Sequence, residues 1–302
     1  MNRFVGELPA DIGLGLSASL TMLCLEDNRF NGTIPASLSK LHNLKFLALD
    51  SNLFVGTIPA ELGELTSLQE LYLGNNSFTA GELPSSFRKL ANLTTLAVWS
   101  CSLVGDFPTF LVEMPELEFL DLFNNSLTGS IPPGIWKLNK LQQLDLSKNN
   151  LTGHLLVEDG FAAMSLKMIY LSNNKLSGML PDFFARLENL TDLYLYDNNF
   201  SGEIPASIAR LPSLSYLQLG NNRFNGTLPP ELGKHSLYLT GVSVDNNELT
   251  GSIPEGLCTG GNLWYFTASS NRLNGFIPAG LVNCAGLIKL NLGSNQLSGQ
   301  VP

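Results

Sequence analysis

Leucine recurs along this chain of 302 residues at a fixed spacing that ends in asparagine. Residues 44–59 read L-x-x-L-x-L-x-x-N-x-F-x-G-x-I-P, and close copies start at Leu68, Leu117, Leu190, Leu214 and Leu287. The spacing predicts a short strand in each copy, with Leu47 and Leu49 pointing into a core and the residues between them pointing to solvent. Segments such as residues 60–65 predict a short helical turn before the next strand.

The asparagine of the repeat returns about every 24 residues and defines a ladder of structural positions. In chain order the ladder residues are Asn28, Asn52, Asn76, Cys101, Asn125, Asn149, Asn174, Asn198, Asn222, Asn247, Asn271 and Asn295. We predict that each asparagine amide satisfies backbone groups of neighbouring turns, which would cost about 1–3 kcal/mol each if they were buried unpaired. Cys101 interrupts the asparagines, and we interpret it as a small buried structural residue rather than a reactive thiol.

These features predict an α/β fold built as a single array, residues 1–302, of about twelve and a half repeats. Stacked repeats form a curved solenoid with a parallel β-sheet on the concave face and short helical or 3-10 turns on the convex face. The sequence starts inside one repeat and stops inside another, at Val301-Pro302. We therefore expect that both end caps are missing and that the chain is an internal fragment or a truncated gene product.

Composition narrows the possible functions. The net charge is −9 and the pI is about 4.8, which argues against a nucleic-acid partner. No stretch reaches the roughly 18 apolar residues of a membrane-spanning helix. The histidines His42, His154 and His235 lie in different repeats, and the four cysteines form no CxxC pair. We therefore predict no metal site, no cofactor and no enzymatic activity.

Aromatic residues gather on the strand positions that face away from the core. Counted back from the ladder residue, these are positions −6, −4, −2 and −1, and every tyrosine except Tyr238 occupies one of them. Rows of rigid amphipathic rings on an open sheet suit an extended partner, and the excess of acids in these columns favours a neutral or basic one. The candidate ligand-binding residues are Glu70, Tyr72, Trp99, Phe119, Asp121, Phe123, Tyr170, Asp192, Tyr194, Tyr196, Tyr216, Gln218, Asp245, Tyr265, Lys289 and Asn291.

The string L-x-G-x-I-P-x-x-L-x-x-L-x-x-L after the asparagine resembles the leucine-rich repeat of plant extracellular receptors along essentially the whole chain. The strings Ile253–Cys258 and Asn283–Cys284 are similar to those of the HAESA-like group of peptide-hormone receptor kinases. The resemblance implies a right-handed leucine-rich-repeat superhelix that serves as the extracellular ligand-recognition segment of a plant receptor-like Ser/Thr kinase. The kinase motifs themselves are absent from the sequence.

The same resemblance implies the partners and the location. We expect a small secreted peptide on the concave face and a co-receptor leucine-rich-repeat kinase as a second partner. The expected location is the extracellular face of the plasma membrane, reached through a membrane helix outside this chain. The alternative is a secreted inhibitor or scaffold similar to the polygalacturonase-inhibiting group, which binds another protein through the same face.

In the HAESA-like group an Arg-x-Arg pair at −6 and −4 of a late repeat clamps the terminal carboxylate of the peptide. This sequence carries Lys289 and Asn291 there, so one charge and one donor remain while the bidentate geometry of arginine is lost.

N-x-S/T sequons exceed the number expected by chance and favour a secreted glycoprotein. The candidate glycosylation sites are Asn31, Asn75, Asn92, Asn124, Asn150, Asn189, Asn199 and Asn225.

Overall fold

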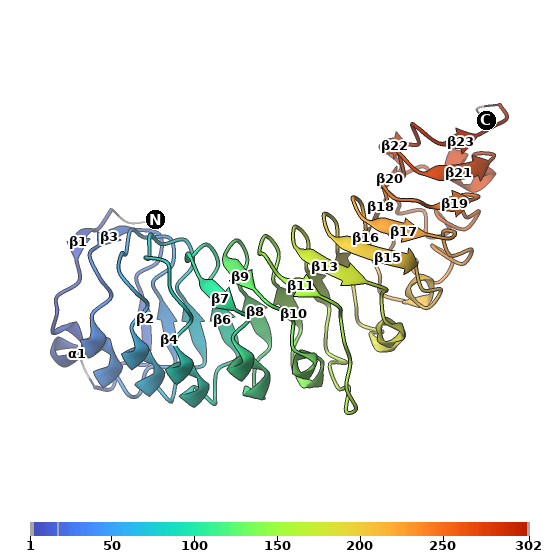
Figure 1. Cartoon of the computed structure of the whole chain (residues 1–302). Coiled ribbons are helices and arrows are strands. Elements are labelled where there is room, and N and C mark those ends of the chain that lie inside the picture. Colours follow the sequence, from blue (N-terminus) through green and yellow to red (C-terminus); the bar gives the residue numbers. More distant parts are fainter. Residues whose placement is uncertain (1–2, 17, 301–302) are drawn as a thin grey trace. The chain divides into compact units, whose positions relative to one another are not determined.

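The computed structural model describes residues 3–16 and 18–300, so both chain ends lie outside the described residues (Figure 1). The chain divides into two compact units. The N-terminal unit comprises Met1–Leu151 with Gly160–Ala163, and the C-terminal unit comprises Thr152–Asp159 with Met164–Pro302. The single array expected from the sequence stays a prediction.

Each unit contains a parallel sheet with one strand from every repeat. In the N-terminal unit the strands are β2 (Met22–Cys24), β4 (Phe46–Ala48), β5 (Glu70–Tyr72), β6 (Thr95–Ala97), β8 (Phe119–Asp121) and β10 (Gln143–Asp145). In the C-terminal unit they are β12 (Met168–Tyr170), β14 (Asp192–Tyr194), β16 (Tyr216–Gln218), β18 (Gly241–Ser243), β20 (Tyr265–Thr267) and β22 (Lys289–Asn291).

The register of these strands places equivalent repeat positions side by side. Asp192 pairs with Tyr216, and Leu193 pairs with Leu217, so each column of the repeat becomes a row across the sheet. The central leucines Leu193 and Leu217 are fully buried, as the alternation of the sequence predicts. We call the sheet face opposite these leucines the open face.

A second set of strands comes after the ladder residues and forms small parallel sheets beside the main ones. They are β1 (Val5–Glu7), β3 (Arg29–Asn31), β7 (Val104–Asp106) and β9 (Ser126–Thr128) in the N-terminal unit. In the C-terminal unit they are β11 (Thr152–Gly153), β13 (Lys175–Gly178), β15 (Asn199–Glu203), β17 (Arg223–Asn225), β19 (Thr250–Gly251), β21 (Arg272–Gly275) and β23 (Gln296–Leu297).

Many of the repeats contain a short helical turn, which lies on the side away from the main sheet (Figure 1). Most begin directly after a proline, whose fixed φ suits the first turn of a helix. They are α1 (Ile12–Gly15), η1 (Ala36–Lys40), η2 (Ala60–Glu64), η3 (Ser85–Lys89), η4 (Thr109–Glu113) and η5 (Pro133–Lys137) in the N-terminal unit. In the C-terminal unit they are η6 (Asp182–Arg186), η7 (Ile208–Arg210) and α2 (Ala279–Val282). The predicted leucine-rich-repeat solenoid, with parallel strands and short 3-10 turns, is confirmed.

The ladder residues tie each repeat to the one before it. Asn198 Nδ2 donates to the carbonyl of Leu171, one repeat back, at 2.9 Å and to the carbonyl of Leu195 at 3.1 Å. Its Oδ1 accepts from the backbone N–H of Leu176 at 3.0 Å. Asn76 makes the same set of bonds in the N-terminal unit. Each amide therefore satisfies buried backbone groups in two repeats.

Cys101 occupies its ladder position as a buried thiol. Its Sγ contacts the carbonyl of Leu73 at 3.4 Å, and Asn125 Oδ1 accepts from the Cys101 N–H at 3.0 Å. Burial raises the pKa of this thiol, because the charged thiolate loses its hydration there. These contacts are those of a residue that fills space in the ladder.

Candidate ligand-binding face

Tyrosine side chains form a row across the open face of the C-terminal unit. The rings of Tyr170 and Tyr194 meet edge to face with 5.0 Å between their centroids. Tyr194 lies 6.4 Å from Tyr196 and 6.4 Å from Tyr216, and Tyr216 stacks on Tyr265 at 6.4 Å. All five side chains are half-buried. The row therefore presents a continuous and partly rigid aromatic surface to solvent.

Tyr265 joins the row because its ring leans across the neighbouring strand. The residue beside it on β18 is Gly241, and a Cβ at Gly241 would overlap the Tyr265 ring. The ring passes over this glycine, and its hydroxyl accepts a hydrogen bond of 2.8 Å from Gln218 Nε2 on β16. Gly241 therefore lets one side chain bridge three strands of the sheet.

The phenol groups of Tyr194 and Tyr265 stay protonated at neutral pH. Burial raises the pKa of Tyr265 to about 12, and the neighbouring Tyr216 adds to the shift. Burial also raises the pKa of Tyr194, and nearby Tyr265 and Asp192 raise it further. Protonated hydroxyl groups can donate to a ligand as well as accept from it.

The two acids predicted for this face, Asp192 and Asp245, differ in the number of hydrogen bonds that their carboxylate oxygens already accept. Asp192 Oδ2 accepts from Thr191 Oγ1 at 2.6 Å, and its side chain is half-buried beside the tyrosines. Asp245 accepts from the hydroxyl groups of Ser243, Thr267 and Ser269, and also from the backbone N–H of Ser269. Four donors fill the capacity of a carboxylate, so Asp245 holds β18 and β20 together.

Lys289 and Asn291 lie on β22, next to the strand that carries Tyr265. Lys289 pairs in register with Tyr265, and its side chain is exposed. Asn291 Nδ2 donates to Ser269 Oγ at 3.1 Å. A positive charge therefore borders the tyrosine row, while the Asn291 amide is partly committed to the neighbouring strand.

The open face of the N-terminal unit has a different character. Tyr72 donates to Glu70 Oε2 at 2.7 Å, and its ring lies 5.4 Å from that of Phe46. Burial and then the Glu70 carboxylate raise the pKa of Tyr72 to about 12. Trp99 lies over Gly74, because a Cβ on this glycine would overlap the indole. In the described part of this unit, these aromatic residues thus contact a carboxylate, another ring or a glycine, and they do not form a row like that of the C-terminal unit.

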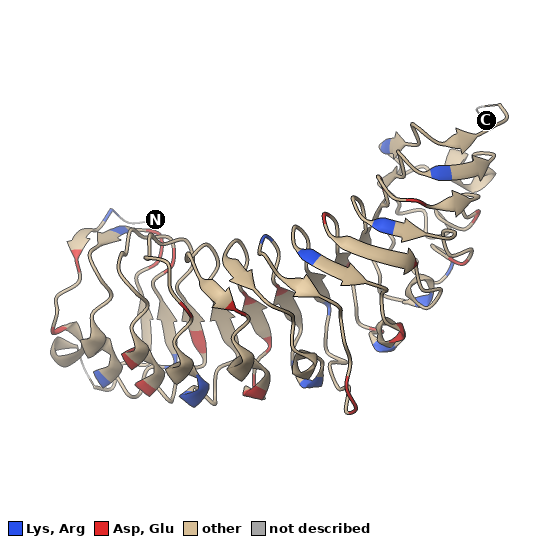
Figure 2. Cartoon of the chain, in the orientation of Figure 1, with Lys and Arg blue, Asp and Glu red and all other residues tan. Residues whose placement is uncertain are grey.

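Phe119, Asp121 and Phe123 lie on and just after β8 in the same unit. Asp121 Oδ1 accepts from the backbone N–H of Phe123 at 2.9 Å, and Asp121 pairs in register with Asp145 on β10. Burial raises the pKa of Asp121 to about 6, and the charge of Asp145 adds to the shift. Lys148 Nζ lies 5.1 Å from the centre of the Phe123 ring, a cation–π contact. Charged residues are spread over both units (Figure 2).

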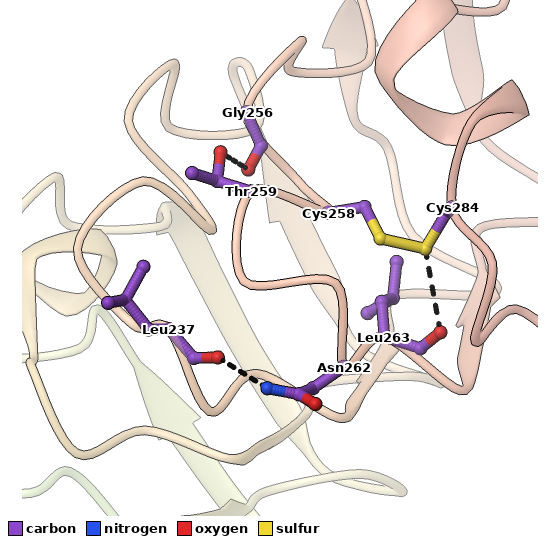
Figure 3. Close-up of a disulfide and its surroundings, with 7 residues drawn as sticks. All are labelled: Leu237, Gly256, Cys258, Thr259, Asn262, Leu263 and Cys284. Carbon is purple, nitrogen blue, oxygen red and sulfur yellow. Dashed lines mark hydrogen bonds between the residues drawn. A yellow bond between two sulfur atoms is a disulfide. The ribbon is translucent and has the colours of Figure 1, made fainter.

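A disulfide joins Cys258 and Cys284 in the C-terminal unit, with 5.9 Å between their Cα atoms (Figure 3). The sequence alone assigned no partner to either cysteine. The two residues are 26 positions apart, about one repeat, and stacking brings such positions side by side. Their separation was therefore the signal that could have identified the bond.

None of the helices in residues 3–16 and 18–300 is long and apolar enough to cross a membrane. Within the same residues, no group of three or more His, Cys, Asp or Glu side chains could hold a metal ion.

The comparison with family models and solved structures agrees with this architecture. A model described as leucine rich repeat matches residues 18–78, 91–151 and 164–224, and a second leucine rich repeat model matches residues 67–90. No curated protein matches the chain in sequence.

Solved structures similar to this chain include plant receptor ectodomains. The structure of a TDR receptor is 37% identical over 100% of the chain, with a TM-score of 0.93, and the chain covers 51% of that protein. The plant peptide hormone receptor RGFR1, in complex with RGF2, is 30% identical over 100% of the chain, which covers 51% of it, with a TM-score of 0.86. The ectodomain of the Arabidopsis receptor kinase HAESA, bound to an extended IDA peptide hormone, is 31% identical over 100% of the chain, which covers 58% of it, with a TM-score of 0.73.

The chain spans about half the length of the first two receptor structures. The family models together match more than half of its residues. The chain therefore belongs to the leucine-rich repeat family.

Proposed function

We propose that this chain is a ligand-recognition segment of a plant receptor-like Ser/Thr kinase and binds a small secreted peptide. The observation that carries the proposal is the tyrosine row on the open face of the C-terminal unit, formed by Tyr170, Tyr194, Tyr196, Tyr216 and Tyr265. Rigid aromatic side chains contribute a large contact area at low entropic cost, which is why they dominate binding hot spots.

The chemistry of the row indicates how a peptide would lie on it. An extended chain that crosses the strands would contact one ring after another, because strands repeat about every 4.8 Å. The half-buried Asp192 carboxylate would favour a basic or neutral residue nearby, and Lys289 would favour a negative group at the other end of the row. A peptide bound in this way would lie on the open face of the sheet.

Several parts of the proposal come from the similar structures. RGFR1 and HAESA are described in complex with peptide hormones, and one HAESA structure also contains the co-receptor SERK1. By analogy, the full protein would present this chain outside the plasma membrane, carry a kinase elsewhere and recruit a leucine-rich-repeat co-receptor.

The proposal is tested by calorimetry of the full chain against a panel of synthetic secreted plant peptides. We expect saturable binding by one peptide class, weakened about 30-fold by Tyr194→Ala, which corresponds to about 2 kcal/mol. Asp192→Asn keeps the shape of the side chain and should weaken binding of a basic peptide less strongly.

The matched control is Tyr238→Ala, because Tyr238 is 67% exposed and lies outside the face. It should leave affinity unchanged, and circular dichroism should show that all three variants are folded. If the folded chain binds no peptide, or if Tyr194→Ala and Tyr238→Ala bind equally well, the assignment of the face is wrong.

A further inference from the structure

The residue just before the ladder residue, at position −1, has the same backbone conformation in repeats of both units. Its φ lies between 53° and 55° in Ser51, Asn75, Asn124, Asn221 and Asn246, among others. This left-handed region is unfavourable for most side chains but is tolerated by asparagine and aspartate. Asparagine therefore recurs at −1 for a conformational reason, at the rim of the open face.

The two units differ in the residue that lies two positions after each of these asparagines. In the N-terminal unit, Asn75 and Asn124 are each paired with serine at that position, so both are N-x-S sequons. In the C-terminal unit the −1 asparagines are Asn173, Asn221 and Asn246, and the residues two positions later are Lys175, Arg223 and Glu248. None of these three is a sequon.

We infer that N-linked glycans on Asn75 and Asn124 cover the rim of the N-terminal open face, and that the C-terminal face is kept bare for the ligand. The inference rests on the proposed function, because it requires that the chain passes through the secretory pathway.

The surroundings of both asparagines fit this role. The side chains of Asn75, Ser77, Asn124 and Ser126 are exposed. Asn75 directly follows Gly74, over which the Trp99 indole lies, and its N–H donates to the Trp99 carbonyl at 2.8 Å. Asn124 directly follows Phe123, and its Nδ2 donates to Ser100 Oγ at 2.8 Å. A bulky, hydrated glycan at either site would therefore border the aromatic residues of this unit.

The −1 residues of the C-terminal unit lack sequons and bond to one another, as Asn124 and Ser100 do in the N-terminal unit. Asn221 Nδ2 donates to Asp197 Oδ1 at 2.6 Å, and Asn246 Nδ2 donates to Asn221 Oδ1 at 2.6 Å. These side chains form a polar chain along the rim of the tyrosine row. The remaining sequons of this unit lie away from the main strands: Asn189 precedes β14, and Asn199 and Asn225 lie on β15 and β17.

The modification requires a lipid-pyrophosphate-linked oligosaccharide as the second reactant. The asparagine Nδ2 attacks the anomeric carbon of the sugar, and a C–N bond forms. The bond between that carbon and the pyrophosphate oxygen breaks, lipid pyrophosphate leaves, and Nδ2 releases one proton. The asparagine remains a neutral amide.

The first test is site occupancy in the full chain secreted from plant cells, measured by mass spectrometry of glycopeptides. We expect glycan on both Asn75 and Asn124. The second measurement is hydroxyl-radical labelling before and after enzymatic removal of glycans. Labelling of Trp99 and Phe123 should rise at least about twofold on deglycosylation, while labelling of Tyr194 and Tyr216 should not change. Unmodified Asn75 and Asn124, or equal labelling in both states, would overturn the inference.

The third test moves a sequon to the other unit. Arg223→Ser makes Asn221 a sequon beside β16, and Arg223→Ala removes the same charge without creating one. Once glycosylated, Arg223→Ser should bind the peptide found by calorimetry at least about tenfold more weakly than Arg223→Ala, and deglycosylation should restore its affinity. Equal affinity of the glycosylated variant and the control would contradict the steric role.

These measurements separate the inference from the proposed function. Occupancy and labelling need no peptide, so they report on the glycans even if no peptide binds. Failure of the unmodified chain to bind any peptide would count against the proposed function alone.

Discussion

The open faces of the two units are built from the same repeat but use it differently. In the C-terminal unit tyrosines on β12, β14, β16 and β20 form one continuous row. In the N-terminal unit the aromatic residues make local contacts, and the half-buried acids Asp121 and Asp145 lie side by side on β8 and β10. The repeat therefore determines the position of each side chain on the open face. The identity of the residue at that position determines whether the face can bind a ligand.

The disulfide gives the largest expected difference between the units. In the described part of the chain, Cys258 and Cys284 are bonded, while Cys24 and Cys101 are free thiols of the N-terminal unit. Replacing both bonded cysteines by serine should destabilise the C-terminal unit by about 3 kcal/mol, the value typical of a loop of this length. Hydrogen exchange should show faster opening around β20 and β22.

The N-terminal unit serves as the internal control for this experiment. In a repeat array, stability is a sum over neighbouring repeats, so the exchange of β4 and β5 should not change. Equal acceleration in both units would mean that the array unfolds as one cooperative body and that the comparison between units does not apply to stability.

Two matched glycine substitutions sharpen the comparison of the faces. Gly241→Ala places a methyl group where the Tyr265 ring lies, so the ring must move and the hydrogen bond from Gln218 is lost. We expect about tenfold weaker peptide binding, or about 1.4 kcal/mol. Gly74→Ala displaces Trp99 in the same way on the other unit.

Gly74→Ala should leave peptide affinity unchanged, because the proposed site lies on the C-terminal unit. Calorimetry on both variants, with the aromatic circular dichroism as a check on ring movement, measures the contrast. A loss of affinity in Gly74→Ala alone would place the ligand on the N-terminal face.

The smallest expected effect concerns the half-buried Asp121 of the N-terminal unit. The pKa of Asp121 is raised from 3.8 to about 6, so the folded state binds this proton more tightly than the unfolded state. The resulting stabilisation is complete below pH 3.8 and is lost as the pH rises through about 6. Asp121→Asn keeps an oxygen that can accept from Phe123 N–H and removes the charge.

Asp121→Asn should therefore be more stable than the unmodified chain at pH 7.5, by on the order of 1 kcal/mol, and of similar stability at pH 3.5. Urea unfolding at the two pH values measures the difference. A variant that is less stable at pH 7.5 would show that the Asp121 charge is stabilised by a partner, contrary to its burial.

The fold was predictable from the sequence because its determinants are periodic. Leu193 and Asn198 have counterparts at the same spacing in neighbouring repeats, and each is buried or bonded by residues one repeat away. A single period thus predicts strands, ladder and core together. The alternation around Leu193 also placed Asp192 and Tyr194 on the open face.

The features that the sequence did not predict depend on contacts specific to one pair of repeats. The role of Gly241 comes from the Tyr265 ring one strand away, and a glycine in a strand does not reveal which neighbour fills its space. The role of Asp245 was likewise not predicted. Thr267 and Ser269 of the next repeat donate hydrogen bonds to its carboxylate, so its oxygens are not available to a ligand. Such pairings break the period and become visible only in three dimensions.

The ladder also has an evolutionary consequence. Asn198 bonds to Leu171 and Leu195, and Asn222 bonds to Leu195 and Leu219 in the same way. Because every such repeat offers the same asparagine donor and the same leucine carbonyl acceptors, one repeat can replace another. Duplication or deletion of a whole repeat therefore leaves the hydrogen bonds of the ladder intact. The tyrosine row can be lengthened or shortened one strand at a time by recombination within the gene, without a new core having to arise.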